Sequence, residues 1–543
     1  MKRFCLLRYV LLFAVLLLAG CNNNEQASLP GVEESLTPEY GDTFIEASIG
    51  DASVLLPVLA SDSASSSINS MLYNGLVRYN KDLVIEGELA ESWEISPDNL
   101  SIVFKLRKNV KWHDGEPFTS ADVKFNYELY VDPKTPTAYA ESFRQVTRVE
   151  APDPYTFIAY YDKPYAPALI SWGMPIHPKH LLEGQDVTKS PLARNPVGTG
   201  PYTLVEWQAG EKIVLESNPD YFEGQPYIKR VVYRIIPDQA TQFLELQTGS
   251  LDFMGLSPLQ YDRQTDTPAF RRLYNKYRYL AFGYTYLGYN LRRPLFQDKR
   301  VRQALSFAIN KQEIIDGVLL GYGVAATGPY KPDTWVYNPD VPRYDYNPDK
   351  ARALLAEAGW EDSDGDGILD KDGQKFSFAI VTNQGNDLRS KTGEIIQRRF
   401  KEIGVDVKLR IIEWATFLKE FINPGNFDAT ILGWTGGPEP DSYNVWHSSK
   451  TGPQQLNFIG FKNAEVDLAL EKGRRVFDLQ QRKAFYDKFQ EVLAEEQPYT
   501  FLYISEALPA VSKRFRGVEA APAGIRYNFN QWFVPKSEQK YTR

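Results

Sequence analysis

Cysteine and histidine are scarce in this sequence, which has two cysteines and four histidines among 543 residues. Both cysteines, Cys5 and Cys21, lie near the N-terminus, so the rest of the chain has no thiol pair that could form a disulfide. His177 and His180 are close in sequence, but Pro178 between them favours a loop over a two-histidine metal site. Stability must therefore come from burial of apolar side chains, and 43% hydrophobic composition over this length is enough for two or three domains.

Catalytic motifs are also missing. The sequence has no Gly-x-Ser-x-Gly nucleophile elbow and no His-Glu-x-x-His zinc motif. We therefore expect a protein that is not an enzyme and that requires no cofactor. Two alternatives stay open at this point: a lipid-anchored hydrolase, for example a glycosidase that uses two of the many carboxylates, and an envelope scaffold or sensor.

Long apolar runs are absent apart from one at the N-terminus. This run, from Tyr9 to Leu18, follows Lys2, Arg3 and Arg8 and ends in Leu-Ala-Gly-Cys at Cys21. It is short for a membrane span, and small residues before a cysteine are typical of a lipoprotein signal peptide. We predict a signal peptide over 1–20, lipidation of Cys21 and a polar tether over 21–40 that holds the protein at the membrane.

Positive charge is in deficit. The formal net charge is −8, and it becomes −11 once the three basic residues of the signal peptide are removed. Such a balance argues against nucleic acid or an anionic membrane surface as the target. Aromatic residues, in contrast, are frequent at 13%, which suits a wet cleft that binds chemically varied ligands, although most of them are expected in the core.

The strongest fold signal lies between residues 376 and 449. Alternating apolar patterns predict three strands with helices between them, which gives a β-α-β-α-β order and a largely parallel sheet. Two strands are predicted at 376–382 and 405–412, and the helices at 388–403 and 414–422. The third strand carries Ala429, Ile431 and Leu432 and ends at Gly433. Because ligands bind beyond the carboxyl ends of parallel strands, the aromatic and acidic segment that follows Gly433 is the predicted crevice.

Two other regions have distinct patterns. Residues 86–161 are rich in short antiparallel strands with one capped helix, as in a small α+β domain, and residues 198–283 contain a second β-α-β unit. The Gly198-Thr199-Gly200 segment is not followed by a helix, so we interpret it as a backbone turn and not as a phosphate loop.

Several blocks of residues resemble the dipeptide, oligopeptide and nickel family (family 5) of extracytoplasmic solute-binding proteins served by ABC transporters. The resemblance covers nearly all of the chain after the signal peptide, and the long block at 104–123 is highly specific. The blocks are Leu72-Tyr-Asn-Gly-Leu76, Leu89-Ala-Glu-Ser-Trp93, Phe104-Lys-Leu-Arg107 through Val110-Lys-Trp-His-Asp-Gly115 to Asp122-Val123, Gly198-Thr-Gly-Pro-Tyr202, Val301-Arg-Gln-Ala-Leu305 and Tyr346-Asn-Pro348.

The resemblance implies an α/β, two-lobed periplasmic-binding-protein-like fold of type II, with an additional small α+β domain and a hinge that closes on the ligand. We expect lobe I to comprise 41–72, 198–283 and 503–543, the small domain 73–197 and lobe II 284–502. It also implies a monomeric lipoprotein of the cell envelope that faces the periplasm or the exterior and delivers ligand to ABC transporter permease subunits.

One position departs from the family. In its peptide-binding members an aspartate shortly after a Gly-Trp pair holds the peptide's ammonium group, whereas the nearest position here is Gly437. Glu439 or Asp441 could supply the carboxylate instead, since a desolvated ammonium needs a partner. The predicted ligand-binding residues are Trp434, Gly437, Glu439, Asp441, Tyr443, Trp446 and His447.

A run of aspartates between residues 361 and 373 suggests a structural calcium site. The pattern Asp-x-Asp-x-Asp-Gly is the first half of an EF-hand loop, but the twelfth position is Gly373 where an EF-hand has glutamate. A solvated acidic turn is the alternative. The predicted ligands are Asp362, Asp364, Asp366, the carbonyl of Ile368, and Asp370.

The sequence thus predicts a substrate-binding protein of an ABC importer that captures short peptides. Aromatic walls and a carboxylate for the ammonium end fit such ligands, and the acidic chain attracts cations at long range. An oligosaccharide or a nickel chelate is the alternative ligand.

Overall fold

The computed structural model describes residues 37–541. The predicted signal peptide, Cys21 and the tether up to residue 36 lie outside the described residues. Within residues 37–541, no helix combines the length and the apolar character needed to cross a membrane.

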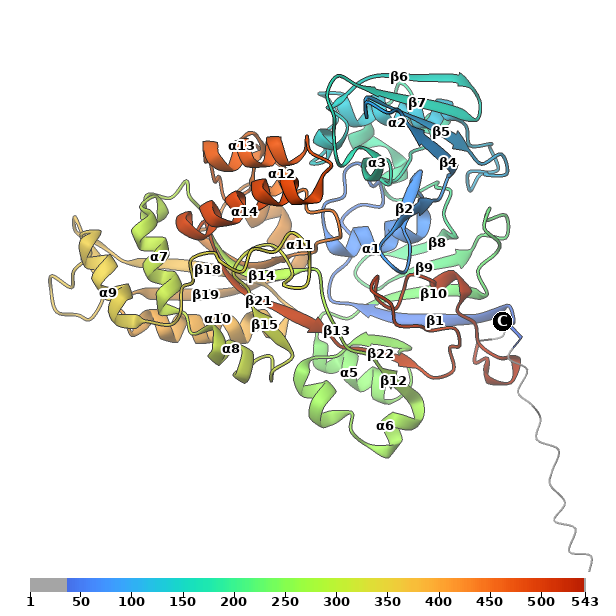
Figure 1. Cartoon of the computed structure of the whole chain (residues 1–543). Helices are drawn as coiled ribbons and strands as arrows, with labels where there is room; N and C mark the ends of the chain where they lie inside the picture. Colours follow the sequence, from blue (N-terminus) through green and yellow to red (C-terminus); the bar gives the residue numbers. More distant parts are fainter. Residues whose placement is uncertain (1–36, 542–543) are drawn as a thin grey trace, which may run out of the picture. The chain divides into compact units, whose positions relative to one another are not determined.

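Two seven-stranded sheets organise the described chain (Figure 1). In the first sheet, β1 pairs in parallel with β10 and β11, and the other neighbours are antiparallel. Its strands, in spatial order, are β12 (Tyr274–Lys276), β22 (Pro509–Ser512), β11 (Phe253–Gly255), β1 (Gly41–Ser48), β10 (Ile228–Ile235), β9 (Lys212–Ser217) and β8 (Tyr202–Gln208). We call this sheet, with α1 (Ser63–Leu72), α5 (Gln239–Gln247) and α6 (Pro268–Leu273), lobe I.

The second sheet contains the predicted parallel unit. β18 pairs in parallel with both β19 and β20, as the β-α-β-α-β pattern indicates. The expectation of a largely parallel sheet was wrong, however, because β20 pairs antiparallel with β14, and β14 with β21. The strands, in spatial order, are β13 (Tyr279–Leu280), β21 (Tyr499–Ala507), β14 (Tyr284–Tyr289), β20 (Ala429–Trp434), β18 (Ser377–Asn383) and β19 (Asp406–Ile412), with β15 (Gly323–Ala325) beside β21.

Helices pack on this second sheet to form what we call lobe II. Two apolar clusters fill the space between helices and sheet, one around Phe378 and Ile396, the other around Trp446 and Phe489. The helices are α7 (Lys299–Ala308), α8 (Lys311–Gly317), α9 (Pro348–Glu357), α10 (Asp387–Lys401), α11 (Trp414–Thr416), α12 (Tyr443–Trp446), α13 (Ala464–Gly473) and α14 (Leu479–Glu496).

A small domain is inserted in lobe I, between α1 and β8. Its four-stranded antiparallel sheet carries α2 (Ser120–Val131) and has its own apolar core around Trp172. The sheet order is β4 (Ala90–Ile95), β5 (Ser101–Leu106), β7 (Thr156–Tyr161) and β6 (Val146–Asp153), beside the hairpin of β2 (Val77–Tyr79) and β3 (Ile85–Gly87) and the short helices α3 (Ala168–Ser171) and α4 (Lys179–Leu182).

The predicted turn at Gly198-Thr199-Gly200 joins this domain closely to lobe I. A Cβ atom on Gly198 would lie 1.8 Å from the carbonyl oxygen of Leu72, so only glycine allows the two backbones to approach in this way. Thr199 Oγ1 also donates a hydrogen bond to Asn74 Oδ1 at 3.0 Å. The small domain is therefore fixed to the end of α1.

The chain passes between the two sheets twice, and both passages lie side by side. Tyr274 and Lys276 pair with β22, and Tyr279 pairs with Ala507 of β21, so the two crossing segments form one antiparallel ribbon. Between these pairs, the N–H of Tyr277 donates to the carbonyl of Pro509 at 2.9 Å.

Candidate functional site

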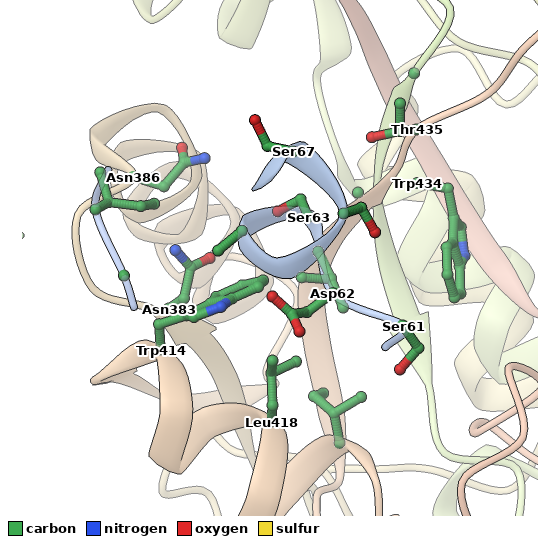
Figure 2. A pocket seen from close by; sticks show the side chains of 18 of the residues that line it. Ser61, Asp62, Ser63, Ser67, Asn383, Asn386, Trp414, Leu418, Trp434 and Thr435 are labelled. Atoms are coloured by element: carbon green, nitrogen blue, oxygen red, sulfur yellow. The ribbon is translucent and has the colours of Figure 1, made fainter. Parts of the chain in front are cut away.

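A cavity of about 920 Å³ lies between residues of lobe I and lobe II (Figure 2). Lobe I contributes the end of β1 and the serine-rich start of α1. Lobe II contributes the ends of β18 and β20 and the segments that follow them. Lining residues include Ser48, Ser61, Asp62, Ser63, Ser67, Tyr233, Asn383, Asn386, Arg389, Trp414, Leu418, Trp434 and Thr435.

Helix α10 positions the cation of this cavity, Arg389. Asn386 caps the helix by accepting from the backbone N–H of Arg389, which places the arginine in the first turn. Gly393, one turn further on, allows α10 to pack tightly on the sheet, since a Cβ there would lie 2.8 Å from Leu409. The sequence thereby brings Arg389 to the carboxyl ends of β18 and β20.

The guanidinium of Arg389 lacks an acidic partner among the described residues. One terminal nitrogen donates to Asn383 Oδ1 at 2.8 Å, whereas Nε has no hydrogen-bond partner. Burial lowers the pKa of Arg389, and the nearby Tyr503 and Tyr286 oppose that effect only in part. An arginine keeps its proton under these conditions, so the cavity contains a positive charge that an anionic ligand group could neutralise.

The carboxylates that line the cavity already have partners. Glu46 accepts a hydrogen bond from Arg526 at 2.7 Å. Asp62 is the N-cap of α1, where it accepts from the backbone N–H of Ser65 at 2.9 Å and from the hydroxyl groups of Ser65 and Ser53. The wall on the lobe I side therefore presents hydroxyl groups rather than free negative charge.

Aromatic rings form part of the wall on the lobe II side. Trp434, at the end of β20, packs against Phe458 with ring centroids 5.7 Å apart, and its indole N–H donates to Tyr499. The indole N–H of Trp414 has no hydrogen-bond partner among residues 37–541. Flat apolar faces suit ligands that carry apolar side chains, and a polar group beside them can fix a ligand's orientation.

The structure separates the seven predicted ligand residues. Trp434 lines the cavity, but the other six do not. Trp446 is completely buried, with its ring 4.5 Å from that of Tyr499, and so belongs to the core of lobe II. Tyr443 and His447 are stacked on each other at 4.0 Å and are also buried. A Cβ on Gly437 would have open space around it.

Glu439 and Asp441 are paired with arginines. Glu439 accepts from Arg482, and Asp441 forms a two-pronged pair with Arg474, at 2.9 Å to Nε and 2.7 Å to Nη2. The suggested role of these carboxylates as anchors for an ammonium group stays a prediction. To bind an ammonium group in place of the arginine, each carboxylate would have to break its present ion pair. Residue spacing could not show this, because α13 and α14, which hold the arginines in place, come later in the chain.

Comparison with known sequences identifies the family. Residues 84–455 match the profile of the bacterial extracellular solute-binding proteins, family 5 middle region. The oligopeptide-binding protein AppA of Bacillus subtilis is 35% identical over 539 residues, which cover 97% of this chain and 98% of AppA. The chain belongs to family 5 of the bacterial extracellular solute-binding proteins. This family consists of substrate-binding proteins of ABC transporters and not of enzymes.

Solved structures of family 5 proteins show the same α/β fold, which confirms the predicted fold class. AppA from Bacillus subtilis, in complex with a nonapeptide, superposes with a TM-score of 0.88 at 35% identity. The match covers 92% of this chain and 100% of AppA. NikZ from Campylobacter jejuni, in complex with Ni(L-His), has a TM-score of 0.82 at 28% identity and covers 91% and 99% of the two chains. DppA from Helicobacter pylori, with the peptide STSA, gives 0.82 at 28% identity, with 92% and 99% covered.

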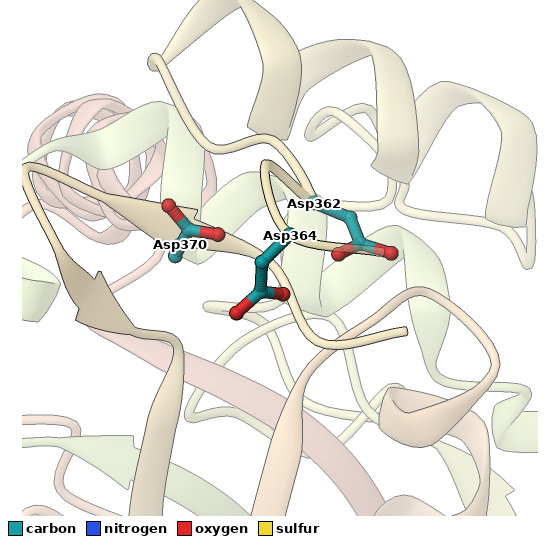
Figure 3. Close-up of side chains that lie close together, drawn as sticks. All are labelled: Asp362, Asp364 and Asp370. Carbon is teal, nitrogen blue, oxygen red and sulfur yellow. The ribbon is translucent and has the colours of Figure 1, made fainter. Parts of the chain in front are cut away.

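The acidic turn of this family 5 protein lies in lobe II, apart from the cavity. Asp362, Asp364 and Asp370 offer carboxylate oxygens within 4.8 Å of one another (Figure 3). Other groups also satisfy these side chains: Lys375 contacts Asp364 at 2.6 Å and Asp366 at 3.0 Å, and Asp370 accepts from Ser363. Calcium, with Asp366 and the carbonyl of Ile368 as further ligands, stays a prediction.

Sequence reasoning missed Arg389, Asn383 and Trp414. The rule that was applied to β20 also covers them, since Asn383 is the last residue of β18 and Arg389 lies in the turn of helix that follows. An arginine in the first turn of a helix that begins with a capping asparagine could have indicated a functional residue. Cations are electrostatically unfavourable at the N-terminus of a helix, so a cation at that position suggests a role other than stabilising the helix.

Proposed function

We propose that this family 5 protein captures short peptides between its lobes and that Arg389 binds the carboxylate end of the ligand. The observation that carries this proposal is a partly buried guanidinium in the cavity with no carboxylate paired to it among residues 37–541. Arginine binds carboxylates through two parallel hydrogen bonds, and a peptide always offers such a group.

The remaining groups of the cavity suit the rest of a peptide. Asn383, Asn386 and the serine hydroxyls at the start of α1 can bond to main-chain amides, while Trp434 and Trp414 can cover side chains of different shapes. AppA of Bacillus subtilis and DppA of Helicobacter pylori were solved with a nonapeptide and with the peptide STSA. Those complexes support a peptide as the class of ligand.

The experiment compares peptides that differ only at their ends. A library of short peptides is screened by thermal shift and its best binder is made with a free or an amidated C-terminus, and with a free or an acetylated N-terminus. Amidation is expected to weaken binding by about tenfold or more, since Arg389 then faces no anion. Acetylation is expected to change affinity less, because Glu439 and Asp441 are paired with Arg482 and Arg474.

Variants assign the effect to Arg389. Arg389→Gln should bind the free and the amidated peptide with nearly equal affinity. The matched control is Arg398→Gln on the same helix, where the exposed arginine pairs with Glu313 and does not line the cavity. A preference for the free carboxylate that survives in Arg389→Gln would contradict the assignment, and a large loss on acetylation would restore the ammonium anchor.

A nickel chelate is the second candidate ligand. NikZ of Campylobacter jejuni, which was solved with Ni(L-His), has the same fold, and a histidine chelate also carries carboxylates that Arg389 could bind. Nickel with histidine and a set of oligosaccharides therefore belong in the same thermal-shift screen. A shift from nickel-histidine and none from any peptide would replace the peptide assignment.

The cellular role extends the same proposal. We infer that Cys21 carries a lipid, that the tether holds a monomer at the cell envelope facing the periplasm or exterior, and that the closed protein delivers its ligand to ABC transporter permease subunits. The motif before Cys21 and the family support this inference. Labelling with a fatty-acid analogue should modify the wild type and not Cys21→Ala.

We also propose that the acidic turn binds calcium. Calcium that binds only the folded state would raise the melting temperature. Asp362→Asn combined with Asp370→Asn should abolish this rise. An unchanged wild-type melting temperature at millimolar calcium would contradict the calcium proposal.

A further inference from the structure

A second group of buried charges joins the small domain to lobe II. Glu141 of the small domain lies between two cations of lobe II: its carboxylate is 3.1 Å from Lys450 Nζ and 3.3 Å from Arg474 Nη1. Arg474 also pairs with Asp441, and the exposed Arg144 approaches Glu141 at 3.8 Å from within the small domain. We call Glu141, Asp441, Lys450 and Arg474 the interlobe cluster.

Three of the four residues of the interlobe cluster are almost fully shielded from water, and Asp441 is partly buried. Glu141 is 5% exposed, and Lys450 and Arg474 are each 3% exposed. The guanidinium of Arg474 also lies over the ring of Tyr443, 3.9 Å from its centroid. Burial alone would lower the pKa of Arg474. The interactions of Arg474 with Asp441, Tyr165 and Glu141 outweigh the effect of burial, so the pKa of Arg474 is raised. The charge of Arg474 is therefore compensated by acidic groups of both domains, whereas burial lowers the pKa of Lys450 although Glu141 opposes that effect.

Further hydrogen bonds cross the same boundary. The backbone N–H of Ala166 donates to the carbonyl of Arg474 at 2.7 Å, and Gln455 donates to the carbonyl of Thr137 at 3.2 Å. Arg475 donates to Gln145 at 2.5 Å. In Figure 1, α13, whose end leads into Arg474, lies beside the small domain.

The small domain is fixed to lobe I, so these contacts connect the two sides of the cavity. Gly198 and Gly200 pack against the backbone at the end of α1, and this arrangement holds the small domain to lobe I. The ribbon of crossing segments also joins the lobes, on another side of the molecule's described part. A rotation that opens the cavity would separate Glu141 from Lys450 and Arg474.

We propose that the interlobe cluster is a latch that sets the balance between the open and closed forms and so sets ligand affinity without contact with the ligand. This proposal rests on the proposed function, since it describes how the same cavity closes. Neither Glu141 nor Arg474 lines the cavity. The apparent dissociation constant rises as the closed fraction of the free protein falls, so the latch would act on every ligand by the same factor.

The test uses Glu141→Gln in the full chain. Without the carboxylate, Lys450 and Arg474 are left with excess positive charge in the closed form, whereas water solvates them in the open form. We expect the scattering radius of the ligand-free protein to increase and the affinity to fall by about tenfold or more, with the ranking of ligands unchanged. The matched control is Glu150→Gln, which breaks a pair with Arg148 within one strand of the same domain.

The outcomes separate this proposal from others. A loss of affinity that differs strongly between ligands would mean that Glu141 contacts the ligand, and an unchanged radius with unchanged affinity would make the cluster purely structural; either result overturns the latch. The scattering measurement needs no ligand, so it remains decisive even where no peptide binds and the proposed function fails. Arg475→Gln, which removes the bonds to Gln145 and to the carbonyl of Pro164, supplies a milder variant should Glu141→Gln not fold, with a smaller change in the same direction.

Discussion

Two partly or fully buried arginines of lobe II have opposite surroundings. Arg474 lies between Asp441 and Glu141 and has its charge compensated by the protein itself. Arg389 lies in the wall of the cavity, where its guanidinium donates to Asn383 and its Nε has no partner among the described residues. A buried charge without a partner is unfavourable, so an unpaired buried charge is expected at a place where a ligand supplies the opposite charge. The first arginine belongs to the structure, and the second is available for a ligand.

Replacing each arginine by methionine should show this difference most clearly. Arg474→Met leaves Asp441 without its cationic partner and removes one of the two buried cations beside Glu141, and it is expected to lower the free energy of unfolding by about 3–5 kcal/mol. Arg389→Met removes an uncompensated charge and should leave stability unchanged or slightly higher, while ligand binding is lost. Urea denaturation followed by fluorescence measures both, and equal destabilisation by the two variants would contradict the comparison.

The two tryptophans of the predicted site give the second contrast. Trp446 is fully buried and contacts Tyr499, so Trp446→Ala should reduce stability by about 3–5 kcal/mol through the cavity it leaves. Trp434 borders the cavity, so Trp434→Ala should cost less than about 2 kcal/mol of stability and mainly weaken binding. Urea denaturation measures the stability of both variants, and calorimetric titration measures their ligand binding. A larger loss of stability in Trp434→Ala than in Trp446→Ala would contradict this prediction.

Two glycines test whether the lobes must approach closely. A Cβ on Gly50 of lobe I would lie 2.6 Å from the ring of Trp414 in lobe II, whereas a Cβ on Gly437 meets nothing within 4 Å. Gly50→Ala should disfavour the closed form by about 1–3 kcal/mol and weaken ligand binding accordingly, and Gly437→Ala should leave binding unchanged. Equal affinities for the two variants would show that Trp414 moves aside freely.

A buried neutral base extends the comparison to pH. His177 is enclosed, its Nε2 accepts from the N–H of Val58 and its Nδ1–H donates to Asn126, and burial lowers its pKa to about 3. The unfolded chain binds this proton near pH 6.5, so the stability that neutral His177 contributes is complete above that pH and is lost as the pH falls toward 3. The slope is about 1.4 kcal/mol per pH unit for one group.

The measurement is the difference between the wild type and His177→Gln in urea denaturation at pH values from 7 to 5. That difference should shrink as the pH falls, since only the wild type has the histidine to protonate. His180→Gln serves as the control, since His180 is exposed and its ring pairs with Asp114. A difference that stays constant with pH would show that His177 titrates normally.

The sequence predicted the fold better than the site. The parallel β18, β19 and β20 arrangement followed from local periodicity, because each strand and helix carries its own apolar pattern. The antiparallel β14 and β21 could not be placed in the same way, since their pairing joins residues more than 200 positions apart. Sequence order therefore favoured a more parallel sheet than the one observed.

The separation of the predicted site residues has a similar origin. Trp446, Glu439 and Asp441 follow a strand end, as ligand residues often do, and nothing near them in the sequence shows that α14, Arg482 and Arg474 cover them. Trp434 was predicted as the first residue beyond the strand; in the structure it is the last residue of β20, and it lines the cavity. Distant partners determine whether a polar or aromatic side chain remains available.

The ribbon that joins the two sheets has a mechanical consequence. Its two strands are hydrogen-bonded to each other on both sides of the passage, at Tyr274 with Ser512 and at Tyr279 with Ala507. A paired ribbon bends across its flat face with little loss of bonding but resists sliding of one strand along the other. The lobes should therefore rotate apart about the ribbon as a hinge, without sliding past each other. The largest displacement should occur at the groups farthest from the ribbon.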